Sequence, residues 1–351
     1  MNHYCTYFDR GYLAQGVALW RSLGRHDAAA QLTVLALDAE AARVLRGFGE
    51  ERLRVLDLAE LLATEVELAA VQATRPRTEF IFALTPCLVR HLLATEHKIQ
   101  RLVYLDADLF FFADAAPIWR ELGGNSVLIT PHRYPAWHDD LARYGRFNVG
   151  VVGFRRDAEG RLCADWWREQ CLASTALTGD GERFGDQKYL DAWPAKFSGV
   201  AECAHAGINT APWNWARHRF AIAADGAVAV DGTPLVVFHF AQFKRISAAW
   251  FDSGQLEYGI MPWRLRSRLY GEYVAALERA EAQIRALLPG FALPRRGWRA
   301  SLGAWHLALL RIFWGQFWWR TGAHLIAGRL GLGRFSGHAM AWYRRRQRRR
   351  K

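Results

Sequence analysis

Two aspartates, Asp106 and Asp108, are the residues of this sequence best suited to chemistry, because they follow directly on the apolar run of residues 102–105. The run predicts a buried strand, and ligands of open α/β sheets bind beyond the carboxyl ends of strands. Lying two residues apart, the carboxylates point to one side if the strand continues. Divalent cations such as Mg²⁺ and Mn²⁺ take carboxylate oxygens as ligands and complete their shells with substrate phosphates. The pair therefore predicts a metal ion that neutralises charge on a diphosphate leaving group.

A solvated turn and a phosphatase site are the two alternatives to a metal site for the aspartate pair. A solvated turn often carries two carboxylates, but here the apolar residues 109–112 follow, which a solvated turn rarely has. Phosphatases of the haloacid dehalogenase type also place an aspartate pair after a strand. Their pair normally lies near the N-terminus with Thr or Val two residues later, and Phe110 stands at that position here. The metal site is therefore the preferred interpretation.

Strand-like and helix-like segments alternate around this pair. Short apolar runs predict strands at 3–8, 31–37, 53–58, 101–112, 126–131, 147–154 and 234–240. Apolar residues at helical spacing predict helices at 11–26, 39–48, 79–96 and 161–174, the third with Pro86 inside it. Because strands separated by helices form βαβ units, this pattern predicts an α/β fold with a parallel sheet.

Composition limits the class of protein. The chain has 351 residues, of which 51% are hydrophobic, enough for a large α/β domain with a sizeable core. Its five cysteines are odd in number and scattered, so we expect reduced thiols in the cytoplasm and neither a disulfide framework nor a zinc site. The first residues run straight into a strand-like segment, so no signal peptide is expected.

Positive charge is concentrated in the C-terminal part. Residues 261–351 hold 19 of the 46 basic and 3 of the 34 acidic residues, which leaves 27 basic and 31 acidic residues before them. A local basic segment indicates an anionic partner, either a membrane surface or nucleic acid. Nucleic acid is disfavoured, because the acidic balance of residues 1–260 offers no second basic face for a groove.

Tryptophan and arginine interleave through residues 296–322, and the chain ends in the arginine-rich segment 344–351. Residues 300–319 have the length of a bilayer-spanning helix, but Arg311 lies near their middle, where a charge is costly. The composition favours a helix on an anionic membrane surface, with aromatic residues at the headgroup level. Packing onto the protein or a second copy, and spanning the membrane, are the alternatives.

Five segments, taken in order, resemble the GT-A nucleotide-sugar transferases, most nearly glycosyltransferase family 8 and its bacterial relatives. They are the opening strand and helix (4–23), the aspartate pair with its strand (101–111), "RFNVGVVGFRRD" (146–157), "FGDQKYLDAW" (184–193) and the histidine of "VVFHFAQFKR" (236–245). The resemblance covers roughly residues 3–250. It implies the GT-A fold, a Rossmann-like and mostly parallel sheet with flanking helices. It also implies transfer of a hexose from a nucleotide-diphosphate sugar, with a UDP-sugar as the expected donor.

The resemblance implies a role for each matching residue. It assigns donor binding to Thr6, Tyr7, Asp9, Asn148, Gly150, Lys244 and Arg245, metal binding to Asp106, Asp108 and His239, and catalysis to Asp186 and Gln187. A histidine among carboxylates suits Mn²⁺ somewhat better than Mg²⁺. Structural alternatives exist: Asp9 as a helix N-cap, His239 as a core histidine and Gln187 as a surface helix residue.

The sequence departs from family 8 in two places. Ala83 precedes Leu84 where the family usually has an arginine. In the late signature H-x-x-G-x-x-K-P-W, Gln242 replaces the glycine, Arg245 stands at the offset of the lysine, and the Pro-Trp pair is missing. These departures concern the phosphate contacts and the choice of donor.

Family 8 enzymes retain the anomeric configuration, so the resemblance implies an oxocarbenium-like transition state. Two routes fit. In the first, Asp186 or a neighbour acts as a nucleophile. In the second, the leaving diphosphate deprotonates the acceptor on the same face, and Gln187 stabilises the cation. We favour the second route, since a glutamine is a poor nucleophile.

The loop "HAGINTAPWNW" (205–215) is the candidate for acceptor binding. Tryptophan faces stack on the C–H faces of sugars, and asparagine amides bind hydroxyl groups. Trp213 and Asn214 are therefore the predicted acceptor residues, the alternative being a packed surface loop.

The sequence thus predicts a GT-A catalytic domain over 1–260, a packing helix over 261–288 and a basic, aromatic-rich helical extension over 289–351. The expected partners are a nucleotide-sugar, a glycan, lipid-linked or envelope polysaccharide acceptor and an anionic membrane, which places the protein at the cytoplasmic face of the inner membrane. One alternative is a catalytically inactive, membrane-associated scaffold that binds sugar-nucleotides. Another is a nucleotidyltransferase, which would need a glycine-rich G-x-G-T-R-like loop that residues 8–16 do not supply.

Overall fold

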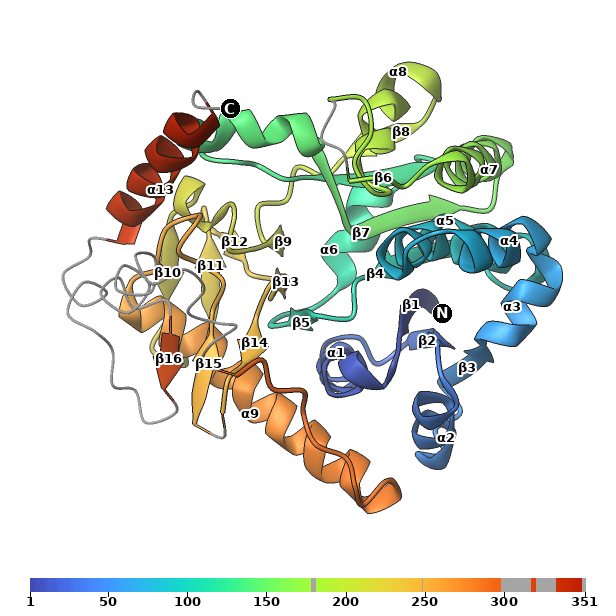
Figure 1. Ribbon diagram of the computed structural model, residues 1–351, viewed down its shortest axis with the longest axis horizontal. Helices are drawn as coiled ribbons and strands as arrows, with labels where there is room; N and C mark the ends of the chain where they lie inside the picture. Colours follow the sequence, from blue (N-terminus) through green and yellow to red (C-terminus); the bar gives the residue numbers. More distant parts are fainter. Residues whose placement is uncertain (178–180, 248, 298–316, 320–332, 349–351) are drawn as a thin grey trace.

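The computed structural model describes residues 1–177, 181–247, 249–297, 317–319 and 333–348 (Figure 1). Within these ranges, a seven-stranded sheet lies between two layers of helices, and three small sheets lie beside it. The site described below forms where the large sheet and one small sheet approach each other.

The central sheet is mostly parallel. Its strands are β1 (Asn2–Phe8), β2 (Ala30–Ala36), β3 (Leu53–Asp57), β4 (Arg101–Leu105), β6 (Val127–Pro131), β7 (Phe147–Arg155) and β8 (Val200–Glu202). Across the sheet they follow the order β3-β2-β1-β4-β7-β6-β8, and only β7 runs antiparallel to its neighbours within the described chain. The predicted α/β architecture, a mostly parallel sheet with flanking helices, is confirmed.

Helices cover both faces of this sheet. One face carries α1 (Leu13–His26), α2 (Ala39–Gly47), α6 (Ala116–Leu122) and α9 (Trp263–Leu287). The other carries α3 (Leu58–Thr64), α4 (Val66–Thr74), α5 (Arg77–Thr95), α7 (Ala158–Ala173) and α8 (Trp193–Lys196). The short 3₁₀ helices are η1 (Arg10–Tyr12), η2 (Ala136–Tyr144), η3 (Lys188–Ala192) and η4 (Trp215–Arg217). Among the α-helices on the two faces, α3, α4, α6 and α8 were not predicted from the sequence.

The alternation of side chains along the strands produces two separate cores. In β1, Tyr4 and Phe8 pack with α1 and α9, whereas Cys5 packs with α5. In β4, Val103 belongs to the first core and Leu102 to the second. Because neighbouring residues of a strand point to opposite faces, a strand buried on both faces becomes a continuous apolar run. This explains why the central strands were predictable from hydrophobicity alone.

Three small sheets lie beside the central one. They are formed by β5 (Leu109–Phe111), β13 (Val237–His239) and β9 (Ile208–Thr210); by β10 (Phe220–Ile222), β11 (Val228–Val230) and β12 (Thr233–Pro234); and by β14 (Lys244–Arg245), β15 (Trp250–Asp252) and β16 (Phe317–Trp319). The first is the important one for function, because β5 follows β4 directly in the chain.

The prediction of one continuous strand at 101–112 is wrong. The chain leaves the central sheet after Leu105, turns, and enters the first small sheet at Leu109, where β5 pairs antiparallel with β13. In the turn, the backbone N–H of Leu109 donates to the carbonyl of Asp106 at 3.2 Å. Both strands are buried, so the apolar pattern on either side of the aspartates carried no sign of the break.

The C-terminal part contains α9, β16 and α13 (Gly333–Arg348) among its described elements. The buried side of α9 packs against α1 and α2. The helix predicted for 300–319 falls largely outside the described residues, and its last three residues form β16 instead, paired with β15. None of the helices described has the length and apolarity needed to cross a bilayer. The membrane-surface role of 289–351 stays a prediction.

A glycine in α1 provides a test of the packing between α1 and β1. A Cβ on Gly16 would lie 2.1 Å from Cε1 of Phe8, so Gly16→Ala must displace the ring or the helix. We expect the free energy of unfolding to fall by about 1–3 kcal/mol in urea denaturation. Gly24→Ala in the same helix is the matched control, because a Cβ there meets no atom within 4 Å and should stabilise the helix by up to about 1 kcal/mol. Equal stability of Gly16→Ala and wild type would contradict this packing.

Candidate functional site

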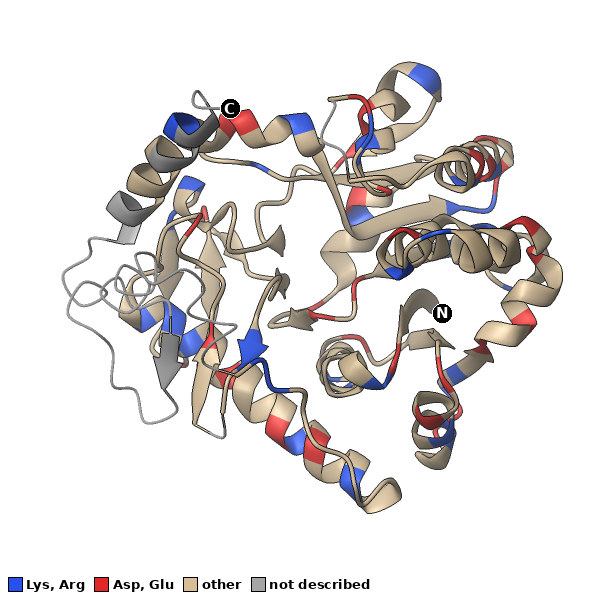
Figure 2. Cartoon of the chain, in the orientation of Figure 1, with Lys and Arg blue, Asp and Glu red and all other residues tan. Residues whose placement is uncertain are grey.

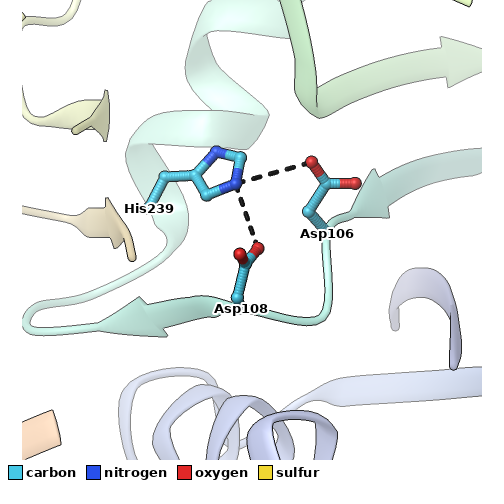
Figure 3. A group of neighbouring side chains, drawn as sticks. All are labelled: Asp106, Asp108 and His239. Atoms are coloured by element: carbon cyan, nitrogen blue, oxygen red, sulfur yellow. Dashed lines mark ion pairs between the residues drawn. The ribbon is translucent and has the colours of Figure 1, made fainter. Parts of the chain in front are cut away.

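The three predicted metal ligands form one cluster (Figure 3). Asp106 follows β4, Asp108 precedes β5, and His239 ends β13. The Nε2 atom of His239 lies 3.0 Å from Oδ1 of Asp108 and 3.6 Å from Oδ2 of Asp106. One ligand atom from each residue can be chosen so that all lie within 4.8 Å of one another. Residues far apart in the chain are thus brought to a common point.

This donor set fits a divalent cation such as Mn²⁺ or Mg²⁺. Two carboxylates and one imidazole are suitable ligands and leave room for others in the coordination shell. The Nδ1 atom of His239 lies 3.2 Å from Oδ1 of Asn209, which accepts its proton in a hydrogen bond. That bond leaves Nε2 free to bind a metal, and ligating histidines are typically held in this way. An ion held by Asp106, Asp108 and His239 would offset the negative charge of a diphosphate.

A buried polar network behind His239 holds Asn209 in place. The Nδ2 atom of Asn209 donates to Oδ1 of Asn148 at 2.9 Å and to Oγ1 of Thr130 at 3.0 Å. Oδ1 of Asn148 also accepts the backbone N–H of Gly150 at 2.8 Å. A Cβ on Gly150 would lie 2.6 Å from that oxygen and 2.7 Å from Nδ1 of His239, so the network needs a glycine there. Asn148 and Gly150 were predicted to contact the donor; they lie in the network that positions His239, and a donor contact stays a prediction.

The electrostatics of the cluster favour a positive charge between the carboxylates. Burial raises the pKa of Asp106, and this outweighs the neighbouring imidazole and the hydrogen bond from the Tyr104 hydroxyl, which is 2.9 Å long. Burial alone lowers the pKa of His239, but the carboxylates of Asp108 and Asp106 reverse this effect, and its pKa is raised. Both carboxylates therefore favour a positive charge at the position that a metal ion would occupy.

A cavity of about 420 Å³ opens beside the cluster. Its lining includes the aromatic residues Tyr7, Tyr12 and Tyr104, the pair Asp9 and Arg77, and all three cluster residues. Asp9 accepts the backbone N–H of Gly11 at 2.8 Å and therefore caps η1, while its other oxygen accepts from Arg77 at 2.6 Å. Asp9 is therefore an N-cap that also lines the cavity, and its contact with the donor stays a prediction. Aromatic walls next to candidate metal ligands suit a planar base attached to phosphates.

The predicted catalytic residue Asp186 lies behind this wall. Its side chain is 5% exposed, and burial, with the nearby Asp106 carboxylate, raises its pKa to about 7. Thr85 connects it to the cavity, because the Thr85 hydroxyl bonds Asp186 and also lies 3.1 Å from the Tyr7 hydroxyl. A substantial fraction of Asp186 is therefore protonated at neutral pH.

Two further predicted residues, Gln187 and Thr6, are not among the described residues of the cavity wall. Nε2 of Gln187 donates to the carbonyl of Tyr144 at 2.8 Å. Thr6 is fully buried within β1. The catalytic role of Gln187 and the donor contact of Thr6 therefore stay predictions.

The predicted acceptor residues, Trp213 and Asn214, are buried close to the metal cluster. The ring of Trp213 meets the ring of His239 edge to face, with centroids 5.0 Å apart, and is almost buried. Asn214 is fully buried; its Oδ1 accepts from Ala211, and its Nδ2 donates to the carbonyls of His132 and Asn209. The side-chain amide of Asn214 thus holds its own loop, and its role as an acceptor residue stays a prediction. For Trp213 the role stays a prediction.

Lys244 and Arg245 line a second, neighbouring cavity of about 270 Å³. Tyr12 lines both cavities and so lies between them. Nη1 of Arg245 is ion-paired with Oε2 of Glu281 at 2.9 Å. The contact of Lys244 and Arg245 with the donor diphosphate stays a prediction, because they line the cavity next to the one that contains the metal cluster.

Sequence reasoning missed four residues of the site: Tyr12, Arg77, Tyr104 and Asn209. Tyr104 had a usable signal, because it lies two positions before Asp106 and therefore on the same face of the strand. Asn209 has a φ of 58°, a conformation in which asparagine is several-fold enriched, but it lay in a loop that offered other polar residues. Arg77 gave no signal, since its partner Asp9 is 68 residues away in the chain.

No protein-family model matches the chain. The chain is similar in sequence to two uncharacterised proteins of Bacillus subtilis strain 168. YfnF is 32% identical over 252 residues, covering 70% of this chain and 82% of its own, and YfnD is 30% identical over 298 residues, covering 83% and 93%.

Solved structures with similarity to the chain include two sugar transferases. One is the galactosyltransferase LgtC in complex with donor and acceptor sugar analogues, with 19% identity, a TM-score of 0.47, and coverage of 86% of this chain and 100% of that one. The other is mouse xyloside xylosyltransferase 1, with 16% identity, a TM-score of 0.46, and coverage of 69% and 98%. Both identities and both TM-scores are low, so neither structure assigns an activity to this chain.

Removal of the Asn209 amide tests the support of the cluster. Asn209→Ala takes away the acceptor for Nδ1 of His239, so the ring is no longer held with Nε2 facing the carboxylates. We expect the affinity for Mn²⁺ to fall about 10- to 100-fold in calorimetric titration, with and without a nucleoside diphosphate. Asn125→Ala, at an exposed position, is the matched control, and circular dichroism checks folding. An unchanged Mn²⁺ affinity in Asn209→Ala would show that the amide has no such role.

The buried carboxyl of Asp186 predicts a pH-dependent stability difference. The pKa of Asp186 is about 7 in the folded state and near 3.8 without burial, so this group lowers the free energy of unfolding of wild type as pH rises from about 4 to 7. Asp186→Asn mimics the neutral acid and has no such loss. In urea unfolding with EDTA, the free energy of unfolding of the variant should rise relative to that of wild type by about 2–3 kcal/mol between pH 5 and pH 8. Asp139→Asn, at an exposed position, serves as control. A constant difference across this range would contradict the raised pKa.

Proposed function

This chain belongs to the same family as YfnF and YfnD of Bacillus subtilis, whose names state no activity, and we propose from the chain's own site that it is a metal-dependent glycosyltransferase. It transfers a hexose from a nucleotide-diphosphate sugar, with UDP as the expected nucleotide, and retains the anomeric configuration. The observation that carries the proposal is that Asp106, Asp108 and His239 line the same cavity as Tyr7 and Tyr12. A nucleotide-sugar needs this combination, because it joins a planar base to a diphosphate.

Each group of residues has a task in binding the donor. Tyr7 and Tyr12 offer aromatic surface to the base and ribose. Asp9, held in place by Arg77, presents a carboxylate to their hydroxyl or N–H groups. Asp106, Asp108 and His239 hold the cation, which when bound would stabilise the charge that develops on the leaving diphosphate.

The position of Asp186 supports the route without an enzyme nucleophile. The bond between the anomeric carbon and the phosphate oxygen breaks, the bond to the acceptor oxygen forms on the same face, and the acceptor proton passes to the leaving phosphate. Asp186 is buried behind Tyr7 and Thr85, and its raised pKa of about 7 leaves it partly protonated at neutral pH. Because Asp186 lies behind these side chains and is not among the described residues that line the cavity, we expect it not to reach the anomeric carbon of a bound donor. Asp186 then supports the site through its hydrogen bond with Thr85.

The acceptor is a glycan, a lipid-linked sugar or an envelope polysaccharide in this proposal. The basic balance of residues 261–351 supports a place at an anionic membrane surface, where lipid-linked acceptors occur. Most of the tryptophan-rich stretch that would make this contact lies outside the described residues.

Release of a nucleoside diphosphate from a panel of nucleotide-sugars tests the proposal. With Mn²⁺ present, we expect slow hydrolysis of at least one donor, abolished by EDTA. Asp108→Asn should lower kcat/KM by at least about 100-fold, because a metal ion contributes several kcal/mol of transition-state stabilisation. Asp114→Asn is the matched control, since Asp114 is an exposed aspartate just after β5.

Two outcomes would overturn the proposal. If no donor is hydrolysed and none raises the melting temperature in Mn²⁺, the chain has no nucleotide-sugar site. If a donor binds but Asp108→Asn and wild type release the same trace of diphosphate, the chain is a binding scaffold without turnover.

A further inference from the structure

A second cavity, next to the proposed donor site, has a lining that neither the metal nor the nucleotide explains. Its volume is about 270 Å³, and its charged lining residues are Lys244, Arg245, Arg295 and Arg296. Figure 2 shows basic residues on β14 and on the segment beside it. We call it the basic pocket.

Backbone pairing holds the charges of the basic pocket together. Arg245 in β14 forms a parallel β-bridge with Arg295, and the N–H of Arg296 donates to the carbonyl of Arg245 at 2.9 Å. Residues 244–245 and 295–296 are therefore neighbours although they lie far apart in the chain. Like charges placed side by side repel each other, so this pairing has an electrostatic cost that a bound anion would remove.

The positive charge of the basic pocket is only partly neutralised. Glu281 is the one carboxylate that is ion-paired with its cations in the described part of the chain, and it is shared between Arg245 at 2.9 Å and Arg285 at 2.7 Å. Lys244, Arg295 and Arg296 make no ion pair with any described residue. All three side chains are exposed at the pocket, where they can donate to an anion.

Most of the remaining lining of the basic pocket is apolar, although Tyr12 and Gln15 also belong to it. Phe243 is half-buried and Pro294 is exposed, so these two side chains form the accessible part of the apolar wall. Phe251 lies behind them, 1% exposed, with its ring stacked on that of Phe243 at a centroid distance of 5.5 Å. A free phosphate ion would use the cations and leave this wall in contact with water. A phosphate attached to a hydrocarbon chain would use both.

Tyr12 links the basic pocket to the proposed donor site. Tyr12 lines both cavities, so a group bound in the basic pocket lies next to the proposed donor site. An acceptor must reach the anomeric carbon from outside the nucleotide cavity. An adjoining pocket that recognises a charged, partly apolar group is therefore well placed to hold it.

We infer that the basic pocket binds the phosphate group of an amphiphilic acceptor, so that the acceptor class is a sugar or hydroxyl compound carried on a lipid phosphate. This inference rests on the proposed function. Arg295 and Arg296 bind the phosphate, and the wall of Phe243 and Pro294 receives the first part of the hydrocarbon chain.

Binding of a simple lipid phosphate tests the inference without the natural acceptor. The full-length protein, saturated with UDP and Mn²⁺, is titrated calorimetrically with decyl phosphate below its micelle concentration. We expect wild type to bind it, and Arg295→Gln/Arg296→Gln to bind it about tenfold or more weakly, since each arginine contributes charge-assisted hydrogen bonds. The affinity of the double variant for UDP should match that of wild type. Arg43→Gln/Arg161→Gln, which removes two exposed arginines from α2 and α7, should change neither affinity.

The inference would be overturned if wild type did not bind decyl phosphate, or if inorganic phosphate bound as tightly as decyl phosphate. It would also be overturned if the variant of Arg295 and Arg296 lost affinity for UDP, because the pocket would then belong to the donor diphosphate. Equal weakening of decyl phosphate binding in the control variant would overturn it as well. Failure of the proposed function is distinguishable, because it appears as a lack of UDP binding in wild type, and decyl phosphate binding is then measured without UDP.

Discussion

The approach of His239 to Asp106 and Asp108 depends on one pairing, that of β5 with β13. Their register places His239 opposite Leu109, directly after the turn that carries the two aspartates. A shift of the register by one residue would turn His239 to the other face of the sheet and break up the cluster. The buried rings of Phe110 and Phe238, which lie opposite each other in this pairing, oppose such a shift. The packing of apolar side chains therefore sets the geometry of a polar site.

The buried network behind the histidine gives the cluster its rigidity. Asn209 satisfies Nδ1 of His239 and is itself held by Asn148 and Thr130, so the ring has a defined orientation before any ligand arrives. Unsatisfied polar groups at this depth would be costly, which means that each member of the network depends on the others. Gly150 belongs to the same unit, because only a glycine leaves space for the three side chains around it. The residues behind the cluster thus shape the site together with its metal ligands.

The sequence was sufficient for six of the seven strands of the central sheet and for the metal cluster, missing only the edge strand β8, and it failed where structure depends on contacts between distant segments. The strands were predictable because burial on both faces makes them apolar, and the aspartate pair because it follows such a strand. The break between β4 and β5 was hidden by that same apolar pattern. The burial of Asn214 was not predicted, because polarity in a loop suggests exposure, yet its amide is used by the backbone of its own loop and by His132. The neighbourhood of Arg245 and Arg295 arises from a bridge that no local pattern encodes.

The central claim is that Asp106, Asp108 and His239 hold a metal ion that faces a nucleotide in the cavity of Tyr7. Anomalous diffraction from crystals grown with Mn²⁺ and UDP tests it most directly. The account predicts a manganese peak within bonding distance of all three side chains, with the UDP phosphates on the ion and the base against Tyr7. A peak bound by other residues, or UDP in another cavity with these three side chains unliganded, would contradict it.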